Sequence, residues 1–165
     1  MPKEGDTGEP HHAVEAMIGV VRKEDCILVI RRADNGAWEP PTGWENRIGR
    51  DTMAQTVEHM ILERTGVIAR VVKEYASSYL RGLPSNPAKG STWWMCHLCD
   101  YKAGEPTLTP EITAAVWLPL DEAADRISAS HFNRIADTLR SVGDGALRSY
   151  EQYNANLARR RATRQ

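Results

Sequence analysis

The sequence predicts an α/β protein in which a mixed β-sheet is covered by helices. Segments with strand character and segments with helix character alternate along the chain, and 165 residues allow one domain of ordinary size. Hydrophobic residues make up 41% of the chain and charged residues 26%, as in globular proteins. This composition excludes collagen-like, coiled-coil and wholly disordered proteins.

Composition also bears on compartment and partners. No apolar run approaches the roughly 20 residues of a membrane-spanning helix, and the acidic segment 1–10 lacks the layout of a signal peptide. Three cysteines, Cys26, Cys96 and Cys99, are too few for a disulfide framework. The formal net charge of -1 points neither to nucleic acid nor to a membrane. We therefore expect a cytoplasmic protein without a membrane or nucleic-acid partner.

We divide the chain into three parts. Residues 1–12 form a flexible lead-in, residues 13–144 the folded domain, and residues 145–165 a C-terminal helix and basic tail. The tail has four arginines and no carboxylate after residue 157, which suits either a phosphate or acidic partner or a solvated helix end. Apolar and tyrosine side chains in the predicted helix offer packing on the domain or on a second copy, so a homodimer is a further hypothesis.

The first half of the domain predicts a hairpin, a loop and a helix. Two apolar runs, 16–21 and 26–31, flank a polar stretch and predict a hairpin. The segment Pro40-Pro41-Thr42-Gly43 then predicts a loop without regular structure, because consecutive prolines remove two backbone donors. A helix is predicted over residues 52–64, with Gly66 as its stop. One face of this helix is apolar, at Ala54, Val57 and Ile61, and either Asp51 or Thr52 is placed to cap it.

The second half predicts three strands and two helices. The strands cover residues 67–72, 92–101 and 114–118, and the helices cover 121–127 and 132–142. Cys96 and Cys99 have the spacing of a zinc or redox site, but a strand directs them to opposite faces, so we expect both to be buried in the core.

A series of motifs in the same order resembles the Nudix hydrolases. The series begins with Arg31-Arg32, the loop 36–43 and the helix end Glu63-Arg64-Thr65-Gly66-Val67. It continues with the strand 93–101, Gly104-Glu105-Pro106, Glu111 and the segment 116–122. The resemblance covers residues 13–142 and implies a Nudix-type α/β/α sandwich. It also implies hydrolysis of a nucleoside-diphosphate-linked substrate with magnesium held by glutamates of the motif G-x5-E-x7-R-E-U-x-E-E-x-G-U, where U is aliphatic.

This chain departs from that motif at the metal-binding positions. With Gly66 and Val67 as the closing pair, the three glutamate positions are occupied by Met60, Glu63 and Arg64. A thioether is a poor magnesium ligand, and an arginine places a fixed positive charge where a cation belongs. The arginine position of the motif holds His59, and its early acidic position holds Asp51.

Two functions follow as hypotheses. The first is a phosphoanhydride hydrolase with a weakened site for Mg²⁺ or Mn²⁺. Its expected residues are Glu63 and Asp51 on the metal, Glu63, Glu111 and His59 in catalysis, and Arg31, Arg32, Trp44 and Arg64 on the substrate.

The alternative is a Nudix-fold module that binds a nucleotide-like metabolite as sensor, carrier or assembly subunit, or that catalyses a metal-independent reaction. The orientation of Arg64 distinguishes the two. A guanidinium turned away from the cleft leaves room for an ion, whereas one that fills the ion position closes it.

Overall fold

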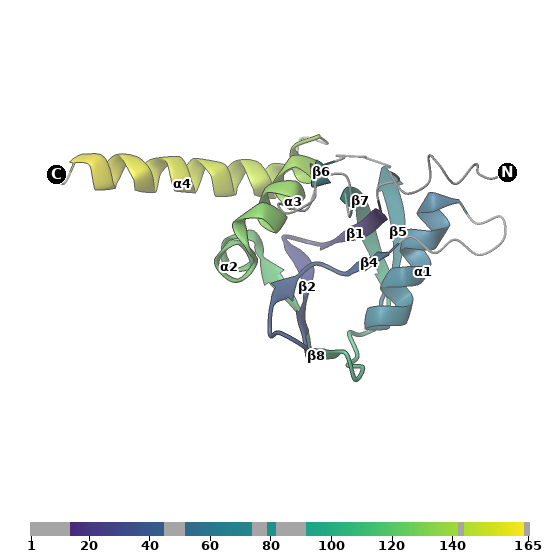
Figure 1. Cartoon of the computed structure of the whole chain (residues 1–165). Coiled ribbons are helices and arrows are strands. Elements are labelled where there is room, and N and C mark those ends of the chain that lie inside the picture. Colours follow the sequence, from purple (N-terminus) through teal and green to yellow (C-terminus); the bar gives the residue numbers. More distant parts are fainter. Residues whose placement is uncertain (1–13, 45–51, 74–78, 82–91, 142–143, 164–165) are drawn as a thin grey trace, which may run out of the picture.

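The computed structural model describes residues 14–44, 52–73, 79–81, 92–141 and 144–163 (Figure 1). The elements in chain order are β1 (Val14–Lys23), β2 (Cys26–Arg32), β3 (Trp38–Glu39), β4 (Thr42–Trp44), α1 (Met53–Thr65), β5 (Ile68–Lys73), β6 (Tyr79–Arg81), β7 (Thr92–Ala103), β8 (Ile112–Pro119), α2 (Leu120–Arg126), α3 (Ala129–Ser141) and α4 (Gly145–Thr163).

The described strands form one mixed sheet. Its main path has the order β3-β2-β1-β7-β5, with β4 also beside β1, β6 beside β7 and β8 beside β2. Strands β1 and β7 run parallel, and the other pairs are antiparallel. Only a long crossover can join parallel neighbours, and here it contains β2 through α1 and the strands that follow.

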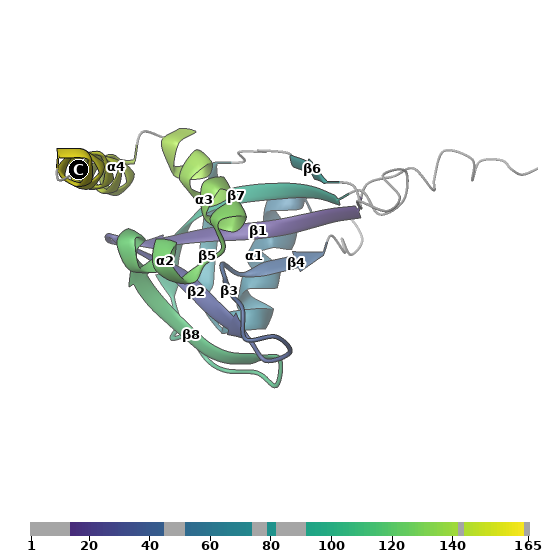
Figure 2. The same ribbon diagram turned by 60° about the vertical axis from the view of Figure 1, so that its left-hand side comes forward.

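Helices cover both faces of this sheet (Figures 1 and 2). Helix α1 packs on one face, where Val57 and Ile61 join Met17 and Leu28 in a buried cluster. Helices α2 and α3 pack on the other face against a second cluster that includes Ile18. The predicted α/β class and the sandwich architecture are therefore confirmed.

Helix α1 has the predicted ends. Thr52 is the N-cap, and a capping box joins it to Gln55 through two reciprocal hydrogen bonds. Gly66 ends the helix in the left-handed conformation, with φ 78°, and its N–H donates to the carbonyl of Leu62. Both ends are thus set by local chemistry that the sequence displays.

The prediction of a loop over residues 40–43 is partly wrong. Strand β3 ends just before the two prolines and β4 begins just after them, pairing with β1 through Thr42 and Gly43. The prolines themselves stay outside both strands, and the carbonyl of Pro41 accepts a hydrogen bond from the N–H of Gly19. Two prolines therefore interrupt strand pairing without preventing it on either side.

The cysteines of strand β7 are buried as predicted. Cys96 belongs to the cluster beneath α2 and α3, whereas Cys99 belongs to the cluster beneath α1. Burial raises the pKa of the Cys96 thiol to about 11 and raises the pKa of the Cys99 thiol as well. These thiols are structural side chains on opposite faces of the strand.

Helix α4 is anchored at its first turn and extends beyond the domain in Figure 1. Asp144 accepts a hydrogen bond from the N–H of Leu147 at 3.1 Å, and it also forms an ion pair with Arg22 of β1. The Leu147 side chain is 1% exposed and packs with the core beneath α2 and α3. Among the described helices, none is both long enough and apolar enough to cross a membrane.

Close packing of α1 on β1 requires a glycine at position 19. A Cβ atom there would lie 2.6 Å from Cδ1 of Ile61, a side chain without solvent exposure. We predict that Gly19→Ala lowers the free energy of unfolding by about 1–3 kcal/mol because the new methyl group overpacks the core.

A double-mutant cycle measured by urea unfolding checks this contact. Ile61→Val removes the Cδ1 atom, so the double variant should recover part of the loss caused by Gly19→Ala, with a coupling energy of roughly 0.5–3 kcal/mol. Simple addition of the two losses would contradict the close approach.

Candidate functional site

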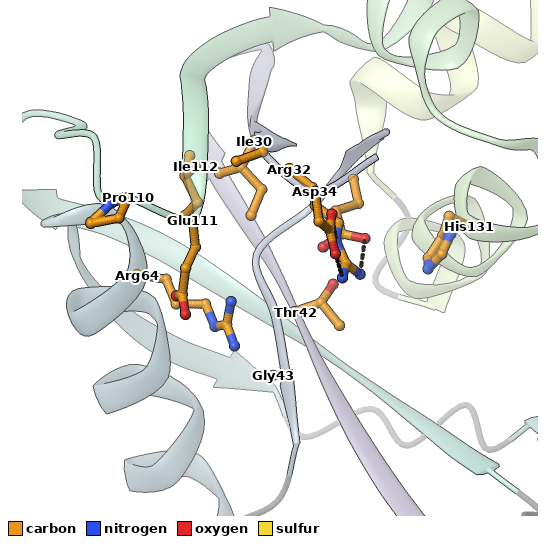
Figure 3. Close-up of a pocket in the computed structure, with 12 residues that line it drawn as sticks. Ile30, Arg32, Asp34, Thr42, Gly43, Arg64, Pro110, Glu111, Ile112 and His131 are labelled. Carbon is orange, nitrogen blue, oxygen red and sulfur yellow. Dashed lines mark hydrogen bonds and ion pairs between the residues drawn. The ribbon is translucent and has the colours of Figure 1, made fainter. Parts of the chain in front are cut away.

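A cavity of about 500 Å³ lies where the end of α1 meets β2, the β3–β4 segment, the start of β8 and the first turn of α3 (Figure 3). Its polar lining carries both signs of charge. The charged and polar side chains on its wall are Arg32, Asp34, Glu39, Thr42, Arg64, Glu111 and His131. A cavity of this kind is the default place to look for a ligand.

Two positions of the Nudix-like motif lie on the side of α1 that faces β4, and one of them, Arg64, lines the cavity. Met60 and Arg64 are one helical turn apart, and both lie over Gly43 of β4. A Cβ atom at Gly43 would be 2.7 Å from Cγ of Met60 and 3.7 Å from Nε of Arg64. The glycine thus lets α1 approach β4 so closely that the Arg64 side chain extends along the strand into the cavity.

The Arg64 guanidinium has no counter-ion of its own among the described residues. It forms neither a salt bridge nor a hydrogen bond with them, although it lines the cavity and its residue is half-buried. Figure 3 shows Arg64 and Glu111 reaching into the cavity from neighbouring walls. Of the orientations considered from the sequence, the structure has the one in which the guanidinium occupies the cleft.

Glu63 and His59 lie on another face of α1. Their side chains are 67% and 57% exposed, and Oε2 of Glu63 lies 3.6 Å from Nε2 of His59. His59 lines a smaller hollow between α1 and β5, and neither residue is on the wall of the main cavity. The structure therefore does not bring Glu63 together with Glu111.

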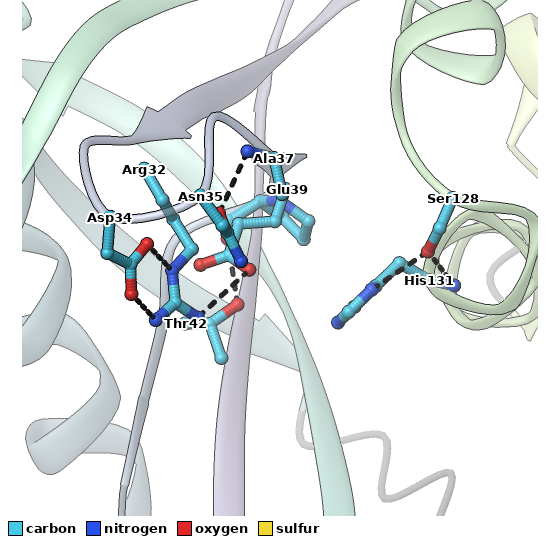
Figure 4. A network of polar contacts seen from close by, with 9 residues as sticks. Arg32, Asp34, Asn35, Ala37, Glu39, Thr42, Ser128 and His131 are labelled. Carbon is cyan, nitrogen blue, oxygen red and sulfur yellow. Dashed lines mark hydrogen bonds and ion pairs between the residues drawn. The ribbon is translucent and has the colours of Figure 1, made fainter.

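Arg32 is held by carboxylates at the end of β2 (Figure 4). Its Nε and Nη2 atoms donate to the two carboxylate oxygens of Asp34 at 3.0 and 2.6 Å, and Nη1 lies 3.9 Å from Oε1 of Glu39. The hydrogen bond from Arg32 holds the pKa of Asp34 below its ordinary value. Because its charge is largely compensated, Arg32 is less available than Arg64 to a ligand.

Glu39 is an acidic residue that the sequence did not single out. It is 7% exposed, and burial raises the pKa of its carboxyl above the ordinary value, while Arg32 and Arg64 lower it by less. Its position between a tryptophan and two prolines carries no sequence signal for a buried carboxylate. Only the pairing of β3 with β2 brings it to the cavity.

His131 is a second residue that sequence reasoning missed. It lies in the first turn of α3, and its Nδ1 atom is 3.1 Å from Oγ of Ser128 (Figure 4). It reaches the cavity because α3 packs on the face of the sheet opposite α1, a tertiary relation without a local signature.

The remaining predicted residues have different placements. Arg31 is outside the cavity wall: its Nε donates to the carbonyl of Gly36 at 3.2 Å, and its guanidinium lies over the Trp38 ring. Trp44 belongs to β4, and its backbone pairs with Ala16 of β1, but its side chain lies outside the described part of the chain. Asp51 also lies outside the described residues. Arg32, Arg64 and Glu111 are the predicted residues that the described cavity brings together.

Comparisons with known proteins identify the family. No family model matches the chain. A MutT-like protein from Streptomyces ambofaciens is 32% identical over 138 residues, which cover 83% of this chain and 83% of that protein. The chain belongs to the Nudix superfamily.

Solved structures of this superfamily share the fold. A Nudix hydrolase from Nitrosomonas europaea has a TM-score of 0.65 at 16% identity, over 79% of this Nudix chain and 90% of that one. An ADP-ribose pyrophosphatase from Streptococcus suis has a TM-score of 0.59 at 20% identity, over 81% and 95%.

The described residues of this Nudix protein do not fit a resident divalent ion. Nudix hydrolases generally use divalent metals. Here Arg64 is the motif position on the cavity wall, Met60 is buried in the cluster beneath α1, and the Glu63 side chain is exposed on another face of the helix. Among the described residues, no three His, Cys, Asp or Glu side chains are grouped so that they could hold a metal.

The raised pKa of Glu39 predicts a pH dependence of stability. The folded protein binds this proton more tightly than the unfolded chain, so the contribution of Glu39 to stability is fully present below the unfolded pKa, about 4.3. It is lost as pH rises through the folded pKa. Replacing Glu39 by Gln should therefore reduce the loss of stability between about pH 4 and about pH 7.

Urea unfolding at both pH values measures this difference. Glu105→Gln, at an exposed carboxylate outside the cavity wall, is the matched control and should follow the wild type. An unchanged pH response in the Glu39→Gln variant would contradict the burial effect.

Proposed function

We propose that this Nudix protein binds a nucleotide-like metabolite with a phosphoanhydride group in the cavity, and that binding, rather than fast metal-dependent hydrolysis, is its main activity. The observation that carries the proposal is the Arg64 guanidinium on the cavity wall, at a motif position where the superfamily places a glutamate. A diphosphate group needs positive charge, and arginine supplies it in a planar fork suited to phosphate oxygens.

The cavity supports this ligand class by its size and lining. Its volume of about 500 Å³ lies within the range of roughly 300–1,000 Å³ typical of small-molecule sites. Charged and polar side chains line much of the cavity, and Ile30 and Ile112 add apolar surface to its wall. Ligands with a nucleoside diphosphate core fit this combination, and the ADP-ribose pyrophosphatase shares the fold that holds it.

Ligand-induced stabilisation tests the proposal. ADP-ribose, UDP-glucose or inorganic diphosphate should raise the melting temperature in the presence of EDTA, whereas adenosine and uridine should not. Binding at 100 times Kd corresponds to about 2.7 kcal/mol of stabilisation. Absence of a shift with every phosphate-containing probe, with and without Mg²⁺, would reject the proposed function.

A slow hydrolase is the second candidate, and the position of Glu111 favours it. Its carboxylate lines the same cavity as Arg64, so a water molecule between them could attack a bound phosphorus atom. The carboxylate of Glu111 would accept the proton of that water, the bridging P–O bond would break, and Arg64 would stabilise the charge on the phosphoryl oxygens.

Product release over nucleoside triphosphates, nucleotide sugars and dinucleoside polyphosphates separates the two candidates. If the protein is a hydrolase, Glu111→Gln should lower kcat by roughly 10²–10⁴ and leave Kd for the ligand nearly unchanged. We expect the wild type to show little turnover with Mg²⁺, Mn²⁺ or EDTA. Fast turnover that requires Mg²⁺ or Mn²⁺ would overturn the assignment of binding as the main activity.

A further inference from the structure

We infer that the guanidinium of Arg64 replaces the divalent cation, so that phosphate oxygens bind to it directly and no metal is needed. This inference rests on the proposed function, because it specifies how the cavity recognises the phosphoanhydride. The inferred site lies at the last turn of α1 and binds phosphate without a metal.

The backbone that carries Arg64 is held firmly. The Thr65 hydroxyl donates to the carbonyl of Ile61 at 2.6 Å, and the carbonyl of Thr65 accepts the N–H of Thr107 at 2.8 Å. Gly66 then ends the helix in a conformation that side chains rarely adopt. A side chain placed by a fixed helix end provides an oriented cation, which lowers the entropic cost of binding.

The side chain is directed to the cavity by its neighbours. Its Nε atom would be 3.7 Å from a Cβ atom on Gly43, so the stem of Arg64 lies against β4. The guanidinium is close enough to Glu39 to lower the pKa of that buried carboxyl. The guanidinium therefore lies near Glu39, on the side of the cavity where glutamates of the motif would otherwise hold a cation.

The charges of the site favour an anion at Arg64 over one at Arg32. Asp34 compensates Arg32 through two hydrogen bonds, whereas Arg64 makes no ion pair in the described part of the chain. A half-buried cation without a counter-ion gains more from a phosphate than a cation that must first release a carboxylate.

The same features oppose a metal ion. The fixed charge of Arg64 repels a divalent cation, and the thioether of Met60 is a poor ligand for magnesium. Of the carboxylates on the cavity wall, Asp34 is hydrogen-bonded to Arg32 and Glu39 lies 3.9 Å from it, which leaves Glu111. Replacing both Met60 and Arg64 by glutamate would put two carboxylates one turn apart over Gly43, one of them on the cavity wall with Glu111, and create a cation site.

Calorimetric titration with UDP-glucose, ADP-ribose and inorganic diphosphate tests recognition by Arg64. The wild type should bind at least one of them with the same Kd in EDTA and in Mg²⁺. Arg64→Gln should raise that Kd roughly tenfold to hundredfold, and Arg64→Lys should have a smaller effect. Arg70→Gln, at an exposed arginine of β5 outside the cavity wall, is the matched control and should bind like the wild type.

Titration with Mn²⁺ alone, followed by electron paramagnetic resonance, tests the metal without any ligand. The wild type should leave Mn²⁺ free in solution, and the Met60→Glu/Arg64→Glu variant should bind it. Thermal unfolding of each variant verifies that it is folded.

The outcomes separate the inference from the proposed function. Binding of a probe that requires Mg²⁺, or binding unaffected by Arg64→Gln, would overturn the inference and leave the proposed function standing. Uptake of Mn²⁺ by the wild type at a site lost in Glu111→Gln would also overturn it. Failure of every probe with and without metal would reject the proposed function, and the inference with it.

Discussion

The close contact of helix α1 with strands β1 and β4 determines the geometry of the site. Gly19 accommodates Ile61, and Gly43 accommodates Met60 and Arg64, so side chains of the helix pack directly onto the backbone of both strands. Ile61 is without solvent exposure and fixes the rotation of the helix about its axis. Once that rotation is fixed, residues 60 and 64 must face β4, with Arg64 on the cavity wall, while residues 59 and 63 must face away from it.

The chemistry of the site follows from this rotation. Most of the superfamily's acidic positions in the helix have here become a thioether and a guanidinium, and the remaining glutamate, Glu63, is exposed beside His59. The cavity has a volume of about 500 Å³, and its wall carries the carboxylates of Glu39 and Glu111 beside Arg64. On our proposal, a fold whose motif gathers carboxylates around a cation here offers a fixed cation to an anion.

The sequence was sufficient for the α/β class and for helix α1, but it did not predict the short strands β3, β4 and β6, and it predicted the site only in part. Helix α1 could be placed because its caps and its buried face are local signals at Thr52, Ile61 and Gly66. The placement of Glu63 could not be predicted in the same way. The motif groups its acidic positions together, but each residue of a helix is rotated by about 100° from the one before, so neighbouring positions point in different directions. Glu39 and His131 reach the cavity through strand pairing and helix packing, which no local pattern announces.

A crystal structure of the protein grown with UDP-glucose and Mn²⁺ tests the central claim most directly, because it locates phosphate, guanidinium and metal together. We expect a phosphate oxygen within hydrogen-bond distance of the Arg64 guanidinium and no anomalous manganese peak in the cavity. A manganese ion bridging the diphosphate and α1, with Arg64 turned toward solvent, would contradict it.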